Sequence, residues 1–182
     1  LAGIDFIHRP YDEEVDWTDA YVWASRVADS GLGITAHVGE FSTVNIEAAL
    51  QILWVSRLGH GVYTATDPRL LDLVLRSGVT LECCLTSNVV LGAVPSLKEH
   101  PIRDLAEVGG PVTLASDNPT RTCTSISREY ERAASLGFDI DELLGMTRQA
   151  ISASFTSPER KQKLLGSVES GTPVFPLWKK GV

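Results

Sequence analysis

Hydrophobic and polar positions follow two alternating patterns along this chain. Short, nearly continuous apolar runs, typical of strands covered on both faces, are separated by longer stretches whose apolar residues recur at helical spacing. We predict strands at residues 1–7, 33–38, 56–60, 79–85 and 112–116. We predict helices at residues 15–29, 44–55, 67–76, 102–108, 125–136, 140–155 and 158–165. The alternation predicts an α/β fold of βαβ units, followed by helices alone.

Polar side chains at the predicted strand ends favour one of the two ways in which such units assemble. Parallel strands form an open sheet or a closed barrel, and in a (β/α)8 barrel of the TIM type the carboxyl ends of all strands meet at one site. His8, His37, His60, Asn88 and Asp117 each end or follow a predicted strand. Five strands and 182 residues fall short of the eight strands and ~250 residues of that barrel. We therefore predict a single domain, residues 1–182, that is the C-terminal part of a barrel with extra C-terminal helices.

The composition limits the partners and the compartment. Sixteen Lys and Arg against 23 Asp and Glu give a formal charge of −7 at pH 7, which disfavours binding to nucleic acid or to an anionic membrane. No run approaches the ~18 apolar residues of a membrane span, and three cysteines form no disulfide framework. We expect a cytoplasmic protein without these partners. The chain begins with Leu1 and its only methionine is Met146, so we expect translated residues before Leu1.

Three of the strand ends carry residues suited to metal and acid–base chemistry. His37 can offer a neutral imidazole to zinc, and Glu40 can face the same cavity as an acid or base because Gly39 lets the backbone turn. His60 ends the next strand, and Asp117 adds a carboxylate after the fifth. Each residue also has a structural interpretation: histidines at strand ends are often hydrogen-bonded structural residues, and Ser-Asp-Asn-Pro is a good turn sequence.

In this order the segments resemble the adenosine deaminase family of zinc-dependent purine aminohydrolases. The family motif H-x-G-E is similar to residues 37–40, and R-[IL]-G-H-[GA] to residues 57–61. L-E-x-C-x-[TS]-S-N is similar to residues 81–88, and [ST]-D-D-P to residues 116–119. The run LECCLTSN, followed by Val94 and Pro95, is most similar to the branch that acts on N6-substituted AMP.

The resemblance implies zinc-dependent hydrolytic deamination of an adenine nucleoside or nucleotide, adenosine or N6-substituted AMP, to an inosine-type product and ammonia. His37 and Asp117 would bind one Zn²⁺, which activates the attacking water. His60 would assist deprotonation of that water and stabilise the growing charge. Glu40, protonated beforehand, would donate to N1 of the purine. The substrate-binding residues would include Gly39.

Three departures from the family pattern keep other interpretations open. The family draws two further zinc ligands from an H-x-H motif that this chain lacks, so we expect them before Leu1, in an N-terminal half of the barrel on the same or a separate chain. Asn118 replaces an aspartate that contacts the purine N7, and its amide can donate there as it stands. His8 replaces a glycine that lies near the purine in the family. It could be a metal ligand, contact the substrate or only pack against its neighbours.

Two alternatives to an adenine deaminase follow from these departures. The chain could have a deaminase fold without activity and serve as a binding or scaffold protein. It could also be an amidohydrolase of the same superfamily that acts on another ring. Among the remaining residues, we predict buried free thiols at Cys83 and Cys84 and a surface or capping role for His100. We interpret residues 175–180 as a docking tail or as cover for an exposed edge of the core.

Overall fold

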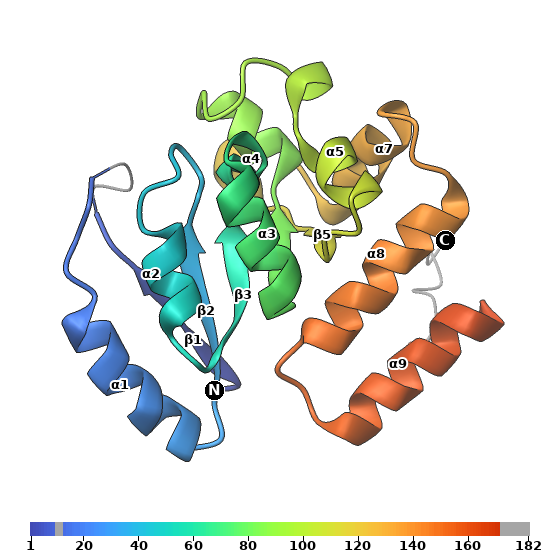
Figure 1. Cartoon of the computed structure of the whole chain (residues 1–182). Coiled ribbons are helices and arrows are strands. Elements are labelled where there is room, and N and C mark those ends of the chain that lie inside the picture. Colours follow the sequence, from blue (N-terminus) through green and yellow to red (C-terminus); the bar gives the residue numbers. More distant parts are fainter. Residues whose placement is uncertain (10–12, 172–182) are drawn as a thin grey trace.

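The five predicted strands form one parallel sheet in the computed structural model, which describes residues 1–9 and 13–171. The sheet runs in chain order, so each strand pairs with its predecessor (Figure 1). The strands are β1 (Gly3–Ile7), β2 (Gly33–Val38), β3 (Val55–His60), β4 (Thr80–Cys83) and β5 (Val112–Leu114). All four pairings are parallel, as βαβ units require.

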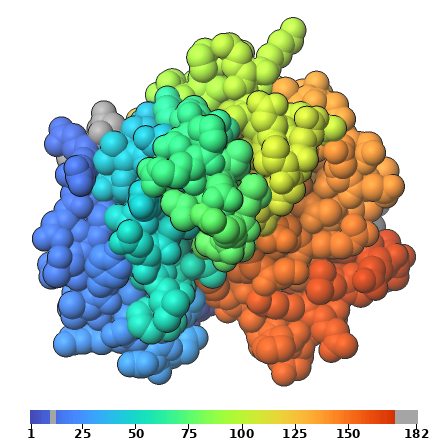
Figure 2. Space-filling model, in the orientation of Figure 1, coloured from blue at the N-terminus to red at the C-terminus, as the bar shows by residue number. Residues whose placement is uncertain are grey.

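Helices connect successive strands and then continue the chain after β5. The helices that cover the sheet or follow it are α1 (Thr18–Asp29), α2 (Ile46–Gln51), α3 (Pro68–Ser77), α5 (Ile102–Glu107), α7 (Ile126–Ser135), α8 (Ile140–Ala153) and α9 (Pro158–Ser170). Short helical segments are η1 (Val62–Thr66), α4 (Leu85–Val90), η2 (Leu97–Glu99) and α6 (Pro119–Thr122). Figure 2 shows α1, α2, α3 and α5 side by side as one outer surface, continued by α8 and α9. The α/β fold with extra C-terminal helices is confirmed.

Local side-chain chemistry sets several helix ends as the sequence indicates. The Asp67 carboxylate accepts hydrogen bonds from the first-turn amides of α3, whose first residue is Pro68, and Gly78 ends this helix in the left-handed region. Ser125 caps α7, and Asp139 forms a capping box at the start of α8. No helix in the described part of the chain is long and apolar enough to cross a membrane. The cytoplasmic location stays a prediction.

Several element boundaries predicted from periodicity are wrong: the helix predicted at 158–165 continues to Ser170, the helix predicted at 15–29 begins at Thr18, and the strand predicted at 112–116 ends at Leu114. Two further errors have a local cause. The strand predicted at 79–85 ends at Cys83, and α4 begins at Leu85 because Glu129, fully buried on α7, accepts hydrogen bonds from the backbone amide and the hydroxyl of Thr86. The helix predicted at 44–55 ends at Gln51, where Ile52 turns to extended dihedrals, and a turn at Leu53 and Trp54 leads into β3. Both errors arise because apolar residues continue across the turn: Cys84 and Leu85 are buried at the first, whereas Leu53 and Trp54 are exposed at the second. Residues 175–180 lie outside the described residues.

Two glycines leave space for an aromatic ring beside the sheet. A Cβ atom on Gly33 would lie 2.1 Å from the Phe155 ring, and one on Gly3 would lie 2.3 Å from it. The same ring lies 3.8 Å from the guanidinium carbon of Arg57 in a cation–π contact. Phe155 follows α8, so this contact attaches the C-terminal helices to the first two strands.

Candidate active site

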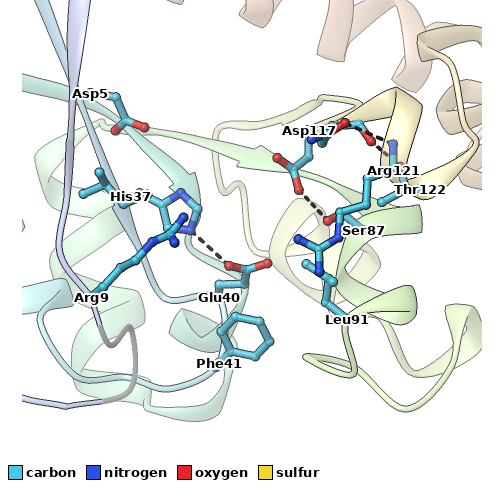
Figure 3. Close-up of a pocket in the computed structure, with 12 residues that line it drawn as sticks. Asp5, Arg9, His37, Glu40, Phe41, Ser87, Leu91, Asp117, Arg121 and Thr122 are labelled. Atoms are coloured by element: carbon cyan, nitrogen blue, oxygen red, sulfur yellow. Dashed lines mark hydrogen bonds and ion pairs between the residues drawn. The ribbon is translucent and has the colours of Figure 1, made fainter.

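A cavity of about 1000 Å³ lies at the carboxyl ends of the strands. His37 and Glu40 reach it from the end of β2, and Asp5 from β1. Ser87 on α4 and Asp117, after β5, close the opposite side (Figure 3). Parallel strands place their carboxyl ends at one edge of a sheet, which is why residues more than 100 positions apart in sequence line one space.

Three of the predicted site residues form a tight cluster in which carboxylate and imidazoles interact. The Nε2 atom of His37 lies 3.0 Å from Oε2 of Glu40, and Nε2 of His60 lies 3.7 Å from Oε1 of Glu40. The two imidazole rings meet edge to face with centroids 4.6 Å apart. Glu40 and His60 are each 3% exposed. Oε1 of Glu40 is buried and accepts no hydrogen bond in the described part of the structure.

The charge state of this cluster follows from its burial. Burial lowers the pKa of the His60 imidazole, and the Glu40 carboxylate opposes that effect only in part. The pKa of Asp5 is raised by burial, against the opposing effect of His37. The site therefore favours a neutral His60 and makes protonation of Asp5 easier than in water.

The backbone at the strand ends determines where these side chains point. His60 and Asp117 have φ angles of 68° and 53°, in the left-handed region that residues other than glycine rarely occupy. Gly39 has a φ of 72°, and a Cβ atom there would lie 2.9 Å from Cα of Gly61, so glycine permits the loops after β2 and β3 to meet. Gly39 is not among the residues that line the cavity, and its substrate contact stays a prediction.

Asp117 and Asn118 lie together at the cavity wall with separate hydrogen-bond partners. The Ser87 hydroxyl donates to Oδ2 of Asp117 at 2.5 Å. The side-chain oxygen of Asn118 accepts a hydrogen bond from the backbone amide of Arg121, so Asn118 caps α6 while it lines the cavity. The turn interpretation and the site interpretation of this segment thus describe the same residues.

The structure places the two remaining predicted histidines away from the cavity lining. The His8 ring packs against the Trp17 ring with centroids 4.5 Å apart, which matches the packing interpretation; its ligand and substrate roles stay predictions. His100 is 4% exposed, so the predicted surface position is wrong, although its Nδ1 atom does accept the backbone amide of Ile102 at the start of α5. The thiols of Cys83 and Cys84 are buried and free, as predicted.

Sequence reasoning missed seven residues that line the cavity: Asp5, Ile7, Arg9, Phe41, Leu91, Arg121 and Thr122. Asp5 carried a usable signal, because it is a carboxylate inside an otherwise apolar strand, and in the structure it is exposed at the cavity. Arg121 carried a weaker one, as a cation directly after the Ser-Asp-Asn-Pro turn. Figure 3 shows its side chain extending over Leu91 towards the cavity.

The chemistry of the side chains at the cavity suits a zinc ion. Zinc takes imidazole nitrogen and carboxylate oxygen, and His37 and Asp117 present one of each to the same cavity. His37, Glu40 and His60 offer ligand atoms that all lie within 4.8 Å of one another. The pair His37 and Asp117 is short of the three protein ligands of a catalytic zinc site, and the two further ligands expected before Leu1 stay a prediction.

Comparison with known proteins identifies relatives of this architecture. A family model described as adenosine deaminase matches residues 5–170. An adenine deaminase of Rhizobium leguminosarum bv. trifolii is 42% identical over 168 residues, which cover 91% of this chain and 50% of that protein. The structure of adenine deaminase from Arthrobacter aurescens matches with a TM-score of 0.85 and 29% identity, over 94% of this chain and 52% of that one. That of N6-methyl-AMP deaminase from Arabidopsis thaliana matches with a TM-score of 0.82 and 30% identity, over 95% and 50%.

These comparisons settle the fold class. The solved relatives are TIM-barrel deaminases, and the chain superposes on about half of each. The prediction that it is the C-terminal part of a (β/α)8 barrel is therefore confirmed. The chain spans about half the length of the curated relatives it matches.

Proposed function

Since this chain belongs to the adenosine deaminase family, we propose that it forms the C-terminal part of a zinc-dependent aminohydrolase. The reaction is hydrolytic removal of the 6-amino group of an adenine nucleoside or nucleotide, adenosine or an N6-substituted AMP, with release of ammonia. One observation carries the proposal: Glu40, whose buried Oε1 makes no hydrogen bond among the described residues, lies between His37 and His60 at a cavity that Asp117 also lines. The relatives named adenine deaminase support the reaction type.

The side chains divide the work by their chemistry. His37 and Asp117 would hold the zinc, which when bound supplies an activated water at neutral pH. Glu40, protonated, would hold its proton at N1 of the purine, because a carboxylic acid at this buried oxygen needs an acceptor. His60 would act through Nε2, by taking a proton from water or by stabilising the negative charge that develops. The Asn118 amide would donate to N7.

Two guanidinium groups at the cavity favour a nucleotide over a free base. Arg9 and Arg121 line the cavity from the segments after β1 and β5, respectively. Arginine matches the geometry of phosphate oxygens, and a charged ligand group gives each contact more free energy than a neutral one. The relative named N6-methyl-AMP deaminase supports a substrate of this class, whereas the relatives named adenine deaminase support a smaller one.

The sheet in the described residues ends at β1 and β5, each of which pairs with one neighbour only. A barrel needs both edges joined, so we propose that an N-terminal half, on the same or a separate chain, supplies the remaining strands and two histidine ligands. The two halves together are called the assembled barrel below. With metal removed by a chelator, we expect the assembled barrel to lose activity and to regain it with Zn²⁺.

The test is deamination by the assembled barrel, followed as the change in ultraviolet absorbance with adenine, adenosine, AMP and N6-methyl-AMP. Glu40→Gln should lower kcat by about 10²–10⁴-fold with zinc retained, because it removes the proton donor to N1. Glu47→Gln is the matched control, since Glu47 is an exposed partner of Arg69, and its kcat should match that of the unaltered barrel. Arg121→Ala should raise KM for AMP about tenfold more than for adenosine.

A second candidate function is that of an inactive binding or scaffold protein. The observation that favours it is the small ligand set of this chain, His37 and Asp117, together with Asn118 in place of an aspartate. An assembled barrel that contains no stoichiometric zinc and changes no substrate in the panel would support this candidate and end the enzyme proposal. Ammonia release from other ring substrates alone would instead support an amidohydrolase of different specificity.

A further inference from the structure

A chain of hydrogen bonds runs from the start of α5 to His60. The backbone amide of Ile102 lies 3.2 Å from Nδ1 of His100, and Nε2 of His100 lies 3.2 Å from Oδ1 of Asn88. Nδ2 of Asn88 lies 3.1 Å from Nδ1 of His60. All three side chains are nearly inaccessible to solvent: Asn88 is 0%, His60 3% and His100 4% exposed.

The donor and acceptor of each hydrogen bond in this series follow from the backbone amide of Ile102, where the series starts. An amide N–H can only donate, so Nδ1 of His100 is an acceptor and, in the neutral ring, Nε2 carries the proton. His100 is neutral at physiological pH because burial lowers its pKa to about 4. Its Nε2–H therefore donates to Oδ1 of Asn88. The Asn88 amide nitrogen is then the atom that faces His60, and it donates to Nδ1.

His60 is left with one arrangement. Because Nδ1 accepts, the proton of the neutral imidazole sits on Nε2, the nitrogen that lies 3.7 Å from Oε1 of Glu40. The alternative tautomer would place two donors face to face at Nδ1. Reversing Asn88 to avoid this would set its amide group against Nε2–H of His100.

We propose that Asn88 and His100 are positioning residues that hold His60 as a hydrogen-bond donor at Nε2, and this assignment rests on the catalytic role proposed for His60. Of the two roles considered for His60, the arrangement selects stabilisation of developing negative charge and excludes proton abstraction by neutral Nε2, which has no free lone pair. None of these three side chains is among the residues that line the cavity, but His60 lies against two that are, Glu40 and His37, so Asn88 and His100 act through His60.

The direct test is a two-bond ¹H–¹⁵N correlation spectrum of the assembled barrel labelled at histidine nitrogens, with His60 assigned by comparison with His60→Gln. The unaltered protein should show a protonated Nε2 and a bare Nδ1 for His60. A protonated Nδ1 in that spectrum would overturn the proposal. The spectrum requires no turnover, so a barrel that deaminates nothing would end the proposed function while this result still decides the hydrogen-bond direction.

Two variants then connect the tautomer to the rate. Asn88→Asp offers two acceptors, so it should move the His60 proton to Nδ1 and lower kcat about 100-fold with little change in KM. His100→Phe removes the donor that orients Asn88, so it should give a mixture of tautomers and lower kcat about tenfold. If the buried charge of Asn88→Asp prevents folding, the His100→Phe spectrum remains as the test.

Thr113→Val is the matched control for the loss of a buried polar group. Thr113 is 4% exposed, and its hydroxyl donates to the carbonyl of Leu81 and not to His60, Asn88 or His100. This variant should keep both the His60 tautomer and kcat. If Asn88→Asp folds and moves the proton to Nδ1, but kcat stays within twofold of the unaltered value, the positioning role is refuted.

Discussion

Acid should destabilise this protein through His100. In the folded state burial lowers the pKa of His100 to about 4, from an ordinary value of 6.5, with a smaller contribution from the charge of His60. Above pH 6.5 His100 is neutral in both the folded and the unfolded state, so its titration does not change the unfolding free energy there. As pH falls below 6.5 the unfolded chain binds a proton that the folded chain does not, so unfolding becomes easier until about pH 4, where the folded state binds it too.

The size of the effect follows from the distance between the two pKa values. They differ by about 2.5 units, and each unit corresponds to about 1.4 kcal/mol, so His100 should withdraw about 3 kcal/mol of unfolding free energy between pH 7 and pH 4. About 2 kcal/mol of this should be lost by pH 5. This is a large fraction of the 5–15 kcal/mol that is typical of a folded domain.

Urea unfolding of the assembled barrel in the presence of a chelator measures this, with His100→Gln for comparison. Glutamine keeps a donor for Asn88 but does not titrate. The variant should therefore have a lower unfolding free energy than the unaltered protein at pH 7. The difference between the two unfolding free energies should shift by about 3 kcal/mol in favour of the variant towards pH 4. Thr113→Val, which removes a buried hydroxyl that does not titrate, should keep a constant gap. A constant gap for His100→Gln as well would refute the reasoning.

Two further predictions concern residues outside this network. Gly33→Ala should lower the unfolding free energy by about 1–3 kcal/mol, because its Cβ atom meets the Phe155 ring at 2.1 Å. In a double-mutant cycle Phe155→Leu should recover part of this loss. Additive effects of the two substitutions would contradict the contact. Asn118→Asp keeps the cap on α6 and should therefore unfold at the same urea concentration as the unaltered protein. Its turnover of adenosine should rise if the amide beside N7 is what limits the reaction of this substrate. Unchanged turnover would show that the preferred substrate differs.

The sheet could be predicted from the sequence because one face of its central strands is fully buried. Ile34, Leu58 and Leu81 on that face are each 0% exposed, whereas β2 alternates buried with partly buried residues and β1 has no fully buried residue, so cover on both faces, as expected from the apolar runs, is wrong. What periodicity could not predict was where an apolar run changes from strand to helix. At Leu85 that change depends on Glu129, which is 44 residues away in sequence and is itself fully buried.

The site was predictable in its residues but not in its connections. His37, Glu40 and His60 could be found because each stands at a strand end, where the topology brings side chains together. The link from His60 through Asn88 to His100 could not, because it depends on α4 beginning where a strand was expected. A histidine followed by proline and a buried isoleucine was the signal available at His100, and it indicated the cap on α5 but not the second bond.

His60 and Asp117 have strained backbones, and each side chain is held by a hydrogen bond from α4. Left-handed φ angles cost residues other than glycine about 1–2 kcal/mol each, and His and Asp adopt them more often than most other residues do. Each strained residue has a hydrogen bond that fixes its side chain: Asn88 donates to His60, and Ser87 donates to Asp117. Because these two donors are consecutive on α4, that short helix connects the ends of β3 and β5. A change that displaces α4 should therefore disturb both sides of the cavity together, and not one alone.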